Sequence, residues 1–254
     1  FGDYRDKNIV NYLKSISSFI YQKKLLKNCD LDIIDSIYYI AQKHNKIVTH
    51  DQARQALTLD KLCKSISDLH NKTFCIIGDG YGNLGSLIKK KFPASKIIFI
   101  NLGRTLLFDL YFTNKIFPNN QHNLIRNNED NLSIDFNYIE AERYRGLDIK
   151  ADIFINIASM QEMNYKEIRM YFDSIRKQDS DTFFYCCNRL EKELVGGEII
   201  KFYNYPWMKQ DEIIFDELCP WHQKFPISKP PFLKSFDGKT QHRLIKVALK
   251  DKCS

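Results

Sequence analysis

The chain has 254 residues, of which 44% are hydrophobic and 27% are charged, a composition typical of globular proteins. This length is sufficient for one large α/β domain with an appendage. No apolar run approaches the roughly 20 residues that a membrane-spanning helix needs, so we expect no membrane insertion. The net charge is +7, but the lysines are scattered and no arginine-rich block occurs, so we expect no nucleic-acid partner.

The cysteines indicate a reducing environment. The chain contains seven, an odd number, and none of them belongs to a Cys-x-x-Cys pair. Their placement in apolar runs predicts reduced, buried thiols. We therefore expect a cytoplasmic location.

The first 71 residues show a helical pattern, with no glycine between Asp3 and Gly78. Helices are expected over residues 9–20, over residues 33–41, after Thr49 and over residues 59–69. Asp30 and Thr49 are suitable N-caps for the second and third of these. We interpret residues 1–71 as a helical cap on a main domain that spans residues 72–254.

The stretch Thr73–Phe92 organises the rest of the chain. It predicts a strand at Phe74–Ile77, a turn with four glycines in eight residues (Gly78–Gly85), and a helix from about Asn83. A tight turn needs positive φ, and a ligand lying on the backbone leaves no room for Cβ atoms. The helix N-terminus then offers free N–H groups to a polar ligand. This pattern is the first βα turn of a nucleotide-binding sheet.

Strands and helices then alternate regularly, which predicts a parallel, doubly wound sheet. The expected elements are the strand Lys96–Asn101, the helix Leu106–Phe117, a loop over Asn119–Ser133, and the strands Ile134–Glu142 and Ala151–Ile157, followed by the helix Tyr165–Arg176 and the strand Thr182–Cys187. The last part lacks long helices. Its strand-like segments Glu198–Tyr205, Ile213–Cys219 and Arg243–Leu249 favour an antiparallel edge.

Two cofactors fit the glycine turn. Gly80-Tyr-Gly82-Asn-Leu-Gly85 satisfies the dinucleotide fingerprint of an NAD-dependent oxidoreductase. Gly78-Asp-Gly80-Tyr-Gly82 equally satisfies the Gly-x-Gly-x-Gly turn of class I methyltransferases that use S-adenosylmethionine (SAM). The antiparallel ending favours the second interpretation.

Six segments in order resemble the sugar O-methyltransferases. They are IIGDGYGNLG around Gly78, FINLGRTLLF after it, FINIASMQEM (Phe154–Met163), YCCNRLEKE (Tyr185–Glu193), YPW (Tyr205–Trp207) and DELCPWH (Asp216–His222). The resemblance covers roughly Thr73 to the C-terminus and leaves the cap outside. It implies an α/β, Rossmann-like class I methyltransferase sheet with an antiparallel final strand, SAM as cofactor, and a sugar or glycoconjugate hydroxyl as acceptor in polysaccharide biosynthesis. A homo-oligomer is a further possibility.

The resemblance also implies a set of cofactor-binding residues at the carboxyl ends of the strands. They are Gly78, Asp79, Gly80, Tyr81, Gly82, Asn101, Leu102, Glu140, Ala141, Ser159 and Gln161. Two positions depart from the family pattern, because Ile76 and Asn101 stand where acids are usual. An acid at the second position accepts both ribose hydroxyls, so Asn101→Asp should bind SAM more tightly. The loss of both acids also raises a third hypothesis, a catalytically degenerate methyltransferase-fold protein that binds without catalysis.

Methyl transfer requires alignment of donor and acceptor and removal of the hydroxyl proton, and it needs no metal. Glu162 is the first candidate base because it follows the fourth strand of the main sheet, and His222 is the alternative. Each also has a purely structural explanation: Glu162 as an acid at a helix N-terminus, and His222 as a loop histidine packed beside Trp221. The spacing of Asp216, Glu217 and His222 does not diagnose a metal site. Candidate substrate-binding residues are Asn188, Arg189, Trp207 and Trp221.

Overall fold

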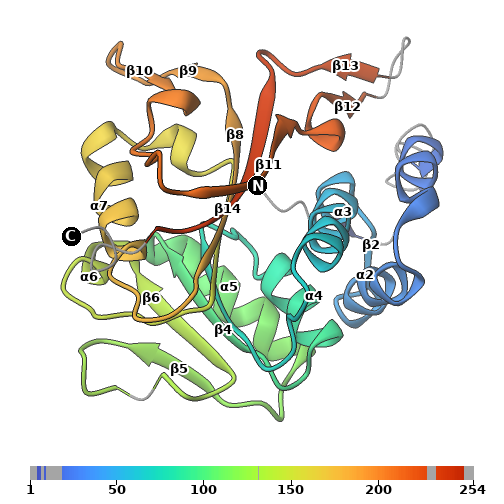
Figure 1. Cartoon of the computed structure of the whole chain (residues 1–254). Helices are drawn as coiled ribbons and strands as arrows, with labels where there is room; N and C mark the ends of the chain where they lie inside the picture. Colours follow the sequence, from blue (N-terminus) through green and yellow to red (C-terminus); the bar gives the residue numbers. More distant parts are fainter. Residues whose placement is uncertain (1–4, 7–8, 10–18, 131, 228–232, 249–254) are drawn as a thin grey trace.

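The computed structural model describes residues 5–6, 9, 19–130, 132–227 and 233–248. An eight-stranded sheet forms its centre (Figure 1). The strands of this sheet are β3 (Thr73–Ile77), β4 (Lys96–Asn101), β5 (His122–Ile125), β6 (Phe136–Glu140), β7 (Ile153–Ile157), β8 (Phe183–Arg189), β11 (Glu212–Leu218) and β14 (Thr240–Lys246). Their order across the sheet is β11-β14-β8-β7-β3-β4-β6-β5.

The direction of the strands confirms the predicted fold class. The neighbours from β5 to β8 are all parallel, whereas β14 is antiparallel to both β8 and β11. The last described strand is thus inserted between two earlier ones, as the class I methyltransferase sheet requires. The fold is α/β, Rossmann-like, with an antiparallel final strand.

Helices cover both faces of the sheet because successive side chains of its strands point to opposite faces. Phe74 and Ile76 of β3 belong to one hydrophobic cluster, together with α4 (Asn83–Lys91) and α5 (Gly103–Ile116). Cys75 and Ile77 belong to the other, together with α7 (Tyr165–Ile175) and the short α6 (Ala141–Tyr144).

Two N-terminal helices, α2 (Leu31–Lys43) and α3 (His50–Ser65), share the first hydrophobic cluster with α4. The predicted caps are confirmed. The Asp30 carboxylate accepts the Asp32 N–H, and Thr49 forms a reciprocal capping box with Gln52. The expected separate helix over residues 59–69 is wrong, because α3 runs continuously to Ser65. Residues 19–25 are helical, and the rest of the first expected helix lies largely outside the described residues. The domain boundary after residue 71 stays a prediction.

Two further expectations need correction. The segment expected as a loop contains β5, which adds an edge strand to the sheet beside β6. The segment 198–205 does not join the main sheet. Its β10 (Ile199–Lys201) pairs instead with β9 (Glu191–Glu193) in a separate hairpin.

The remaining described elements are short. They are β1 (Arg5–Asp6), β2 (Lys46–Ile47), β12 (Lys224–Pro226), β13 (Leu233–Ser235), and the 3-10 helices η1 (Leu26–Asn28), η2 (Met160–Glu162), η3 (Phe202–Asn204) and η4 (Pro220–His222). Among the described helices, none has the length and apolar character needed to cross a membrane.

Candidate functional site

The glycine turn lies at the carboxyl end of β3, between two neighbouring parallel strands. Gly78, Gly80 and Gly82 have φ values of +82°, +94° and +64°, a region that side chains with a Cβ rarely adopt. The Gly78 N–H donates to the Ile100 carbonyl of β4 at 2.9 Å. The turn therefore starts in register with the sheet and then bends away from it into α4.

The space beside three of the glycines is filled by the protein itself. A Cβ on Gly78 would lie 2.5 Å from the Ser159 hydroxyl, and one on Gly82 would lie 2.5 Å from a methyl of Thr113. A Cβ on Gly85 would lie 2.2 Å from the Phe99 ring. Internal packing therefore already requires glycine at these positions, and close approach of a ligand to them stays a prediction.

Two buried carboxylates occupy the back of the turn. The Asp79 side chain accepts the N–H groups of Leu84 at 3.2 Å and Gly85 at 2.9 Å, both in the first turn of α4. Asp109 of α5, which is fully buried, accepts the Gly82 N–H at 2.7 Å. Burial raises the pKa of Asp79 to about 6, and burial together with the charge of Asp79 raises the pKa of Asp109 well above its ordinary value.

The charge near the glycine turn determines whether an anionic or a cationic ligand can bind there. In a dinucleotide site, the first N–H groups of the helix bind a pyrophosphate. Here Asp79 and Asp109 already take the N–H groups of Gly82, Leu84 and Gly85, and the negative charge of Asp79 would repel a phosphate. A positively charged group fits this environment better.

Asn101, at the end of β4, is held by internal hydrogen bonds. Its amide Nδ2 donates to Asp109 Oδ2 at 2.9 Å, and its Oδ1 accepts the Leu102 N–H at 3.0 Å. Its neighbour in register on β6 is Glu140. The Glu140 carboxylate lies beside Gly103 at the start of α5, because a Cβ there would be 2.8 Å from Glu140 Oε1. The acid that Asn101 lacks thus stands one strand further along the same edge.

A cavity of about 220 Å³ opens beside the turn. It lies between α3, the glycine turn, the end of β7 and the segments that carry η4 and β14. Its wall consists of Asp51, Arg54, Gln55, Gly78, Asp79, Ile157, Ala158, Gln161, Glu162, Arg189, His222, Phe236 and Thr240. We refer to it as the lateral pocket.

The end of β7 is shaped by one residue with unusual backbone geometry. Ala158 has a φ of +56°, which costs an L-residue roughly 1 kcal/mol, and its N–H donates to the Cys187 carbonyl at 2.8 Å. The following Ser159 donates its hydroxyl to the Ile77 carbonyl at 2.8 Å. These bonds hold the strand end against β3 and β8 and direct the next residues into the lateral pocket.

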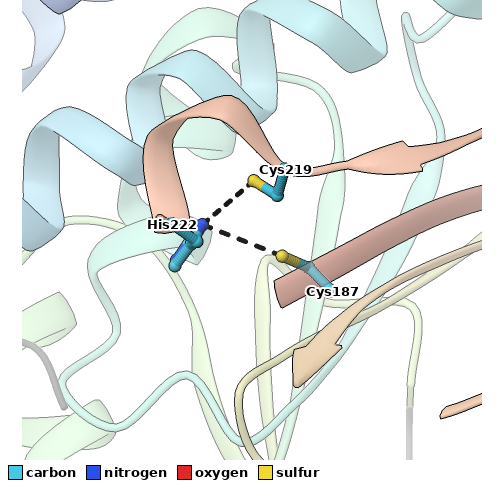
Figure 2. Close-up of side chains that lie close together, drawn as sticks. All are labelled: Cys187, Cys219 and His222. Atoms are coloured by element: carbon cyan, nitrogen blue, oxygen red, sulfur yellow. Dashed lines mark hydrogen bonds between the residues drawn. The ribbon is translucent and has the colours of Figure 1, made fainter. Parts of the chain in front are cut away.

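Both candidate bases line this pocket, although they are 60 residues apart in the sequence. Glu162 is partly exposed and its Oε1 forms an ion pair with Lys192. The His222 Nδ1 points instead at two thiols, 3.2 Å from the Cys219 sulfur and 3.7 Å from the Cys187 sulfur (Figure 2). Burial works to raise the pKa of Cys187, but the Cys219 hydrogen bond and the charge of His222 outweigh it and hold that pKa well below its ordinary value.

The structure separates the four predicted substrate-binding residues. Arg189 lines the lateral pocket. Asn188 is fully buried; its Oδ1 accepts the Gln161 N–H and its Nδ2 donates to Asn156 Oδ1. This corrects the expectation that Asn188 contacts substrate, because it joins β8 to β7 and η2 instead.

The two tryptophans pack against other side chains away from the lateral pocket, with Trp221 buried and Trp207 partly buried. Trp207 lies among Phe172, Phe184 and Phe202, and its indole N–H donates to the Phe202 carbonyl at 2.9 Å. Trp221 is 8% exposed, and its indole N–H donates to Thr58 Oγ1 of α3 at 3.3 Å. Neither lines the lateral pocket, so stacking of either ring on a sugar stays a prediction.

The predicted cofactor residues gather along one edge of the sheet. Asn101 ends β4 and Leu102 follows it, Glu140 ends β6 and Ala141 follows it, and Gly78 and Asp79 follow β3. Tyr81 packs its ring on Phe108 and Phe112 of α5, at 5.4 Å between ring centroids in each case. Gln161 accepts the Arg189 N–H at 2.8 Å and so fixes the edge of the lateral pocket.

Sequence reasoning missed three charged residues of the site. Asp109 is a lone acid in the apolar helix LLFDLYF, a signal that could have been used. Asp51 and Arg54 belong to α3, which the sequence assigned to the cap, and Arg54 Nη1 donates to Asp51 Oδ1 at 2.8 Å. Their position in the pocket depends on how α3 packs, which local patterns do not reveal.

No family model matches the chain, and no curated protein matches it. Solved structures give only distant similarities. Coclaurine N-methyltransferase bound to N-methylheliamine and S-adenosylhomocysteine is 11% identical, with a TM-score of 0.45, covering 65% of this chain and 51% of that one. A protein from Nostoc punctiforme described as an O-methyltransferase is 8% identical, with a TM-score of 0.47, covering 82% and 60%.

Human N-acetylserotonin methyltransferase in complex with SAM is 9% identical, with a TM-score of 0.43, covering 82% of this chain and 55% of that one. The chain thus spans about half to three-fifths of the length of these structures. Similarity at this level does not identify a cofactor or a substrate for this chain. The fold assignment therefore rests on the strand order and directions of the sheet itself.

Proposed function

We propose that the chain is a SAM-dependent O-methyltransferase whose acceptor is a hydroxyl of a sugar or glycoconjugate. The observation that carries the proposal is the pair of buried carboxylates, Asp79 and Asp109, behind the glycine turn of a sheet with methyltransferase strand order. SAM carries a sulfonium and an ammonium group, and both are cations. A negative turn attracts such a ligand and disfavours NAD, the runner-up, through its pyrophosphate.

The residues at the sheet edge fit the parts of SAM. Asp79 would attract the ammonium end, and Glu140 would accept the ribose hydroxyls in place of Asn101. Leu102, 68% exposed, offers an apolar surface for the adenine ring. When bound, SAM supplies an electrophilic methyl group, so the protein has only to orient the acceptor and take its proton.

The lateral pocket supports a hydroxylated acceptor. Its wall carries the side chains of Asp51, Arg54, Glu162 and Arg189, which are hydrogen-bonding groups that suit a sugar. Its volume of about 220 Å³ lies below the roughly 300–1,000 Å³ of sites for drug-sized ligands. One sugar ring, free or at the end of a longer glycan, matches this size and polarity.

Glu162 is the proposed base within this pocket. Its carboxylate is accessible, whereas the Nδ1 of His222 is engaged with two thiols. A carboxylate that borders the pocket can accept the acceptor's hydroxyl proton as the methyl group moves. The cytoplasmic location and a homo-oligomeric state stay predictions.

Transfer of a radiolabelled methyl group from SAM to a panel of nucleotide sugars and oligosaccharides tests the proposal. We expect label in a sugar O-methyl ether, and a several-fold higher acceptor KM for Arg189→Gln. The matched control is Trp207→Phe, which lies outside the pocket and should leave the KM unchanged. Binding of SAM without transfer to any acceptor would favour the degenerate binding protein, and label on a nitrogen would contradict the sugar acceptor.

A further inference from the structure

Three side chains with metal-binding chemistry meet next to the lateral pocket. Cys187 lies in β8, Cys219 follows β11, and His222 ends η4 (Figure 2). Their sulfur and nitrogen ligand atoms all lie within 4.8 Å of one another, and all three residues are buried. Among the described residues, no other three His, Cys, Asp or Glu side chains bring their ligand atoms this close together.

The distances match those of a tetrahedral zinc site. With Zn–S bonds of about 2.3 Å and Zn–N bonds of about 2.0–2.1 Å, a tetrahedron separates a sulfur from a nitrogen by about 3.6 Å. The His222 Nδ1 lies 3.2 Å from the Cys219 sulfur and 3.7 Å from the Cys187 sulfur. The three ligand atoms therefore need only small shifts to surround a common point.

The fold fixes these ligands from both sides of β14. Cys187 pairs with His242 of β14, and the Cys219 N–H donates to the Thr240 carbonyl at 2.9 Å on the other side of the same strand. Both cysteines belong to the hydrophobic cluster on the α3 face of the sheet. Cys186, one residue earlier, belongs to the cluster on the opposite face. Only one of the two adjacent cysteines of β8 can therefore reach the His222 ring.

We propose that Cys187, Cys219 and His222 bind one zinc ion. Two soft thiolates together with an imidazole, which also suits zinc, select zinc over magnesium or calcium. With three protein ligands, the fourth position is left for a water molecule or for an oxygen of a bound acceptor. Because His222 lines the lateral pocket, the ion would fasten the η4 turn to β8 and fix that wall. The inference does not depend on the methyltransferase proposal, since the ligand set alone carries it.

Metal binding to the reduced, chelator-treated chain tests the inference. We expect one Zn²⁺ per chain, and with Co²⁺ the visible bands of a tetrahedral ion plus a thiolate-to-cobalt charge-transfer band. Cys187→Ser and Cys219→Ser should each lower zinc affinity at least tenfold and weaken that band. Cys186→Ser is the matched control, because it removes the adjacent thiol on the opposite face, and it should leave both unchanged.

X-ray absorption at the zinc edge of the loaded wild-type chain gives a test that needs no variant. The expected first shell has two sulfurs at about 2.3 Å and at least one nitrogen at about 2.0–2.1 Å. A shell without sulfur, an unchanged cobalt band in Cys187→Ser, or a Cys187–Cys219 disulfide in place of metal binding would each overturn the inference. Because these readouts require neither SAM nor activity, their failure would leave the methyltransferase proposal unaffected.

Discussion

Asp79 gives the glycine turn a charge that depends on pH. Burial raises its pKa from 3.8 to about 6, so between these values the folded chain holds a proton that the unfolded chain has lost. The stability that this group contributes is therefore complete below about pH 4 and is lost as the pH rises through about 6. A cationic ligand requires the ionised form, so its affinity should change in the opposite direction.

We therefore expect SAM to bind more tightly as the pH rises from about 5 to about 7, with little change above that range. Calorimetric titration across this range measures the effect. Asp79→Asn should bind SAM weakly and without this pH dependence. An affinity of the wild-type chain that is the same at both ends of the range would show that Asp79 does not face the cation.

The hydrogen bonds of Asn101 predict that Asn101→Asp destabilises the fold, a cost that the sequence did not reveal. An aspartate there would place a carboxylate against Asp109 Oδ2, where the Asn101 amide now donates at 2.9 Å. Loss of the Asn101 amide donor should lower the free energy of unfolding by about 1–3 kcal/mol at neutral pH. Urea unfolding measures it, with Asn119→Asp on the exposed surface as a control for the added charge. If Asn101→Asp is as stable as the control and binds SAM more tightly, the sequence-based view of this position is correct.

One methyl-transfer assay distinguishes the two candidate bases, Glu162 and His222. Glu162→Gln keeps size and hydrogen bonding but cannot take a proton, so the methyl-transfer rate should fall by about 10²–10⁴-fold. Its SAM affinity should stay within about twofold of the wild-type value. His222→Ala should cost less, because the His222 Nδ1 faces two thiols rather than the acceptor. The reverse ranking of the two variants would exclude Glu162 as the base.

At the scale of elements, α3 links the N-terminal helices to the site. Its capping box joins Thr49 to Gln52, and the Gln52 amide also donates to Asn83 Oδ1 at the start of α4 at 3.4 Å. The helix that begins at the glycine turn and the helix that carries Asp51 and Arg54 into the pocket are thus held together at their N-termini. This arrangement predicts that the N-cap of α3 affects acceptor binding.

Thr49→Ala should lower the free energy of unfolding by about 1 kcal/mol, the usual cost of losing an N-cap hydroxyl. It should also raise the acceptor KM more than the Kd for SAM, because α3 lines the acceptor side. Denaturant unfolding and steady-state kinetics measure the two effects. Thr49→Ser retains the hydroxyl and should behave like the wild-type chain. A serine variant as unstable as the alanine variant would show that the N-cap hydroxyl does not cause the loss of stability.

Runs of apolar residues in the sequence predicted some strands and helices correctly and missed others. The bounds of β4 match, because the four apolar residues IIFI lie between Lys96 and Asn101, just before a helix start. β5 was missed because its sequence, HNLI, is polar and short, and only pairing with β6 makes it a strand. The break expected within α3 does not exist, since Leu59 and Leu62 continue the buried face of the same helix.

At the scale of the whole molecule, the sheet order could be predicted from sequence only through the family resemblance. Alternation of strands and helices predicts a parallel sheet, but nothing local places β14 between β8 and β11. The same insertion brings Cys187 and Cys219 together on either side of β14. From sequence, His222 could be considered as a metal ligand only together with Asp216 and Glu217, because these are its neighbours along the chain.

Calorimetric titration of the wild-type chain at about pH 7.5 with SAM, S-adenosylhomocysteine and NAD⁺ tests the central claim most directly. The two carboxylates behind the glycine turn predict one SAM site per chain with a micromolar Kd, similar binding of S-adenosylhomocysteine through the same ammonium and ribose, and no heat with NAD⁺. Binding of NAD⁺ with no binding of SAM would contradict the account.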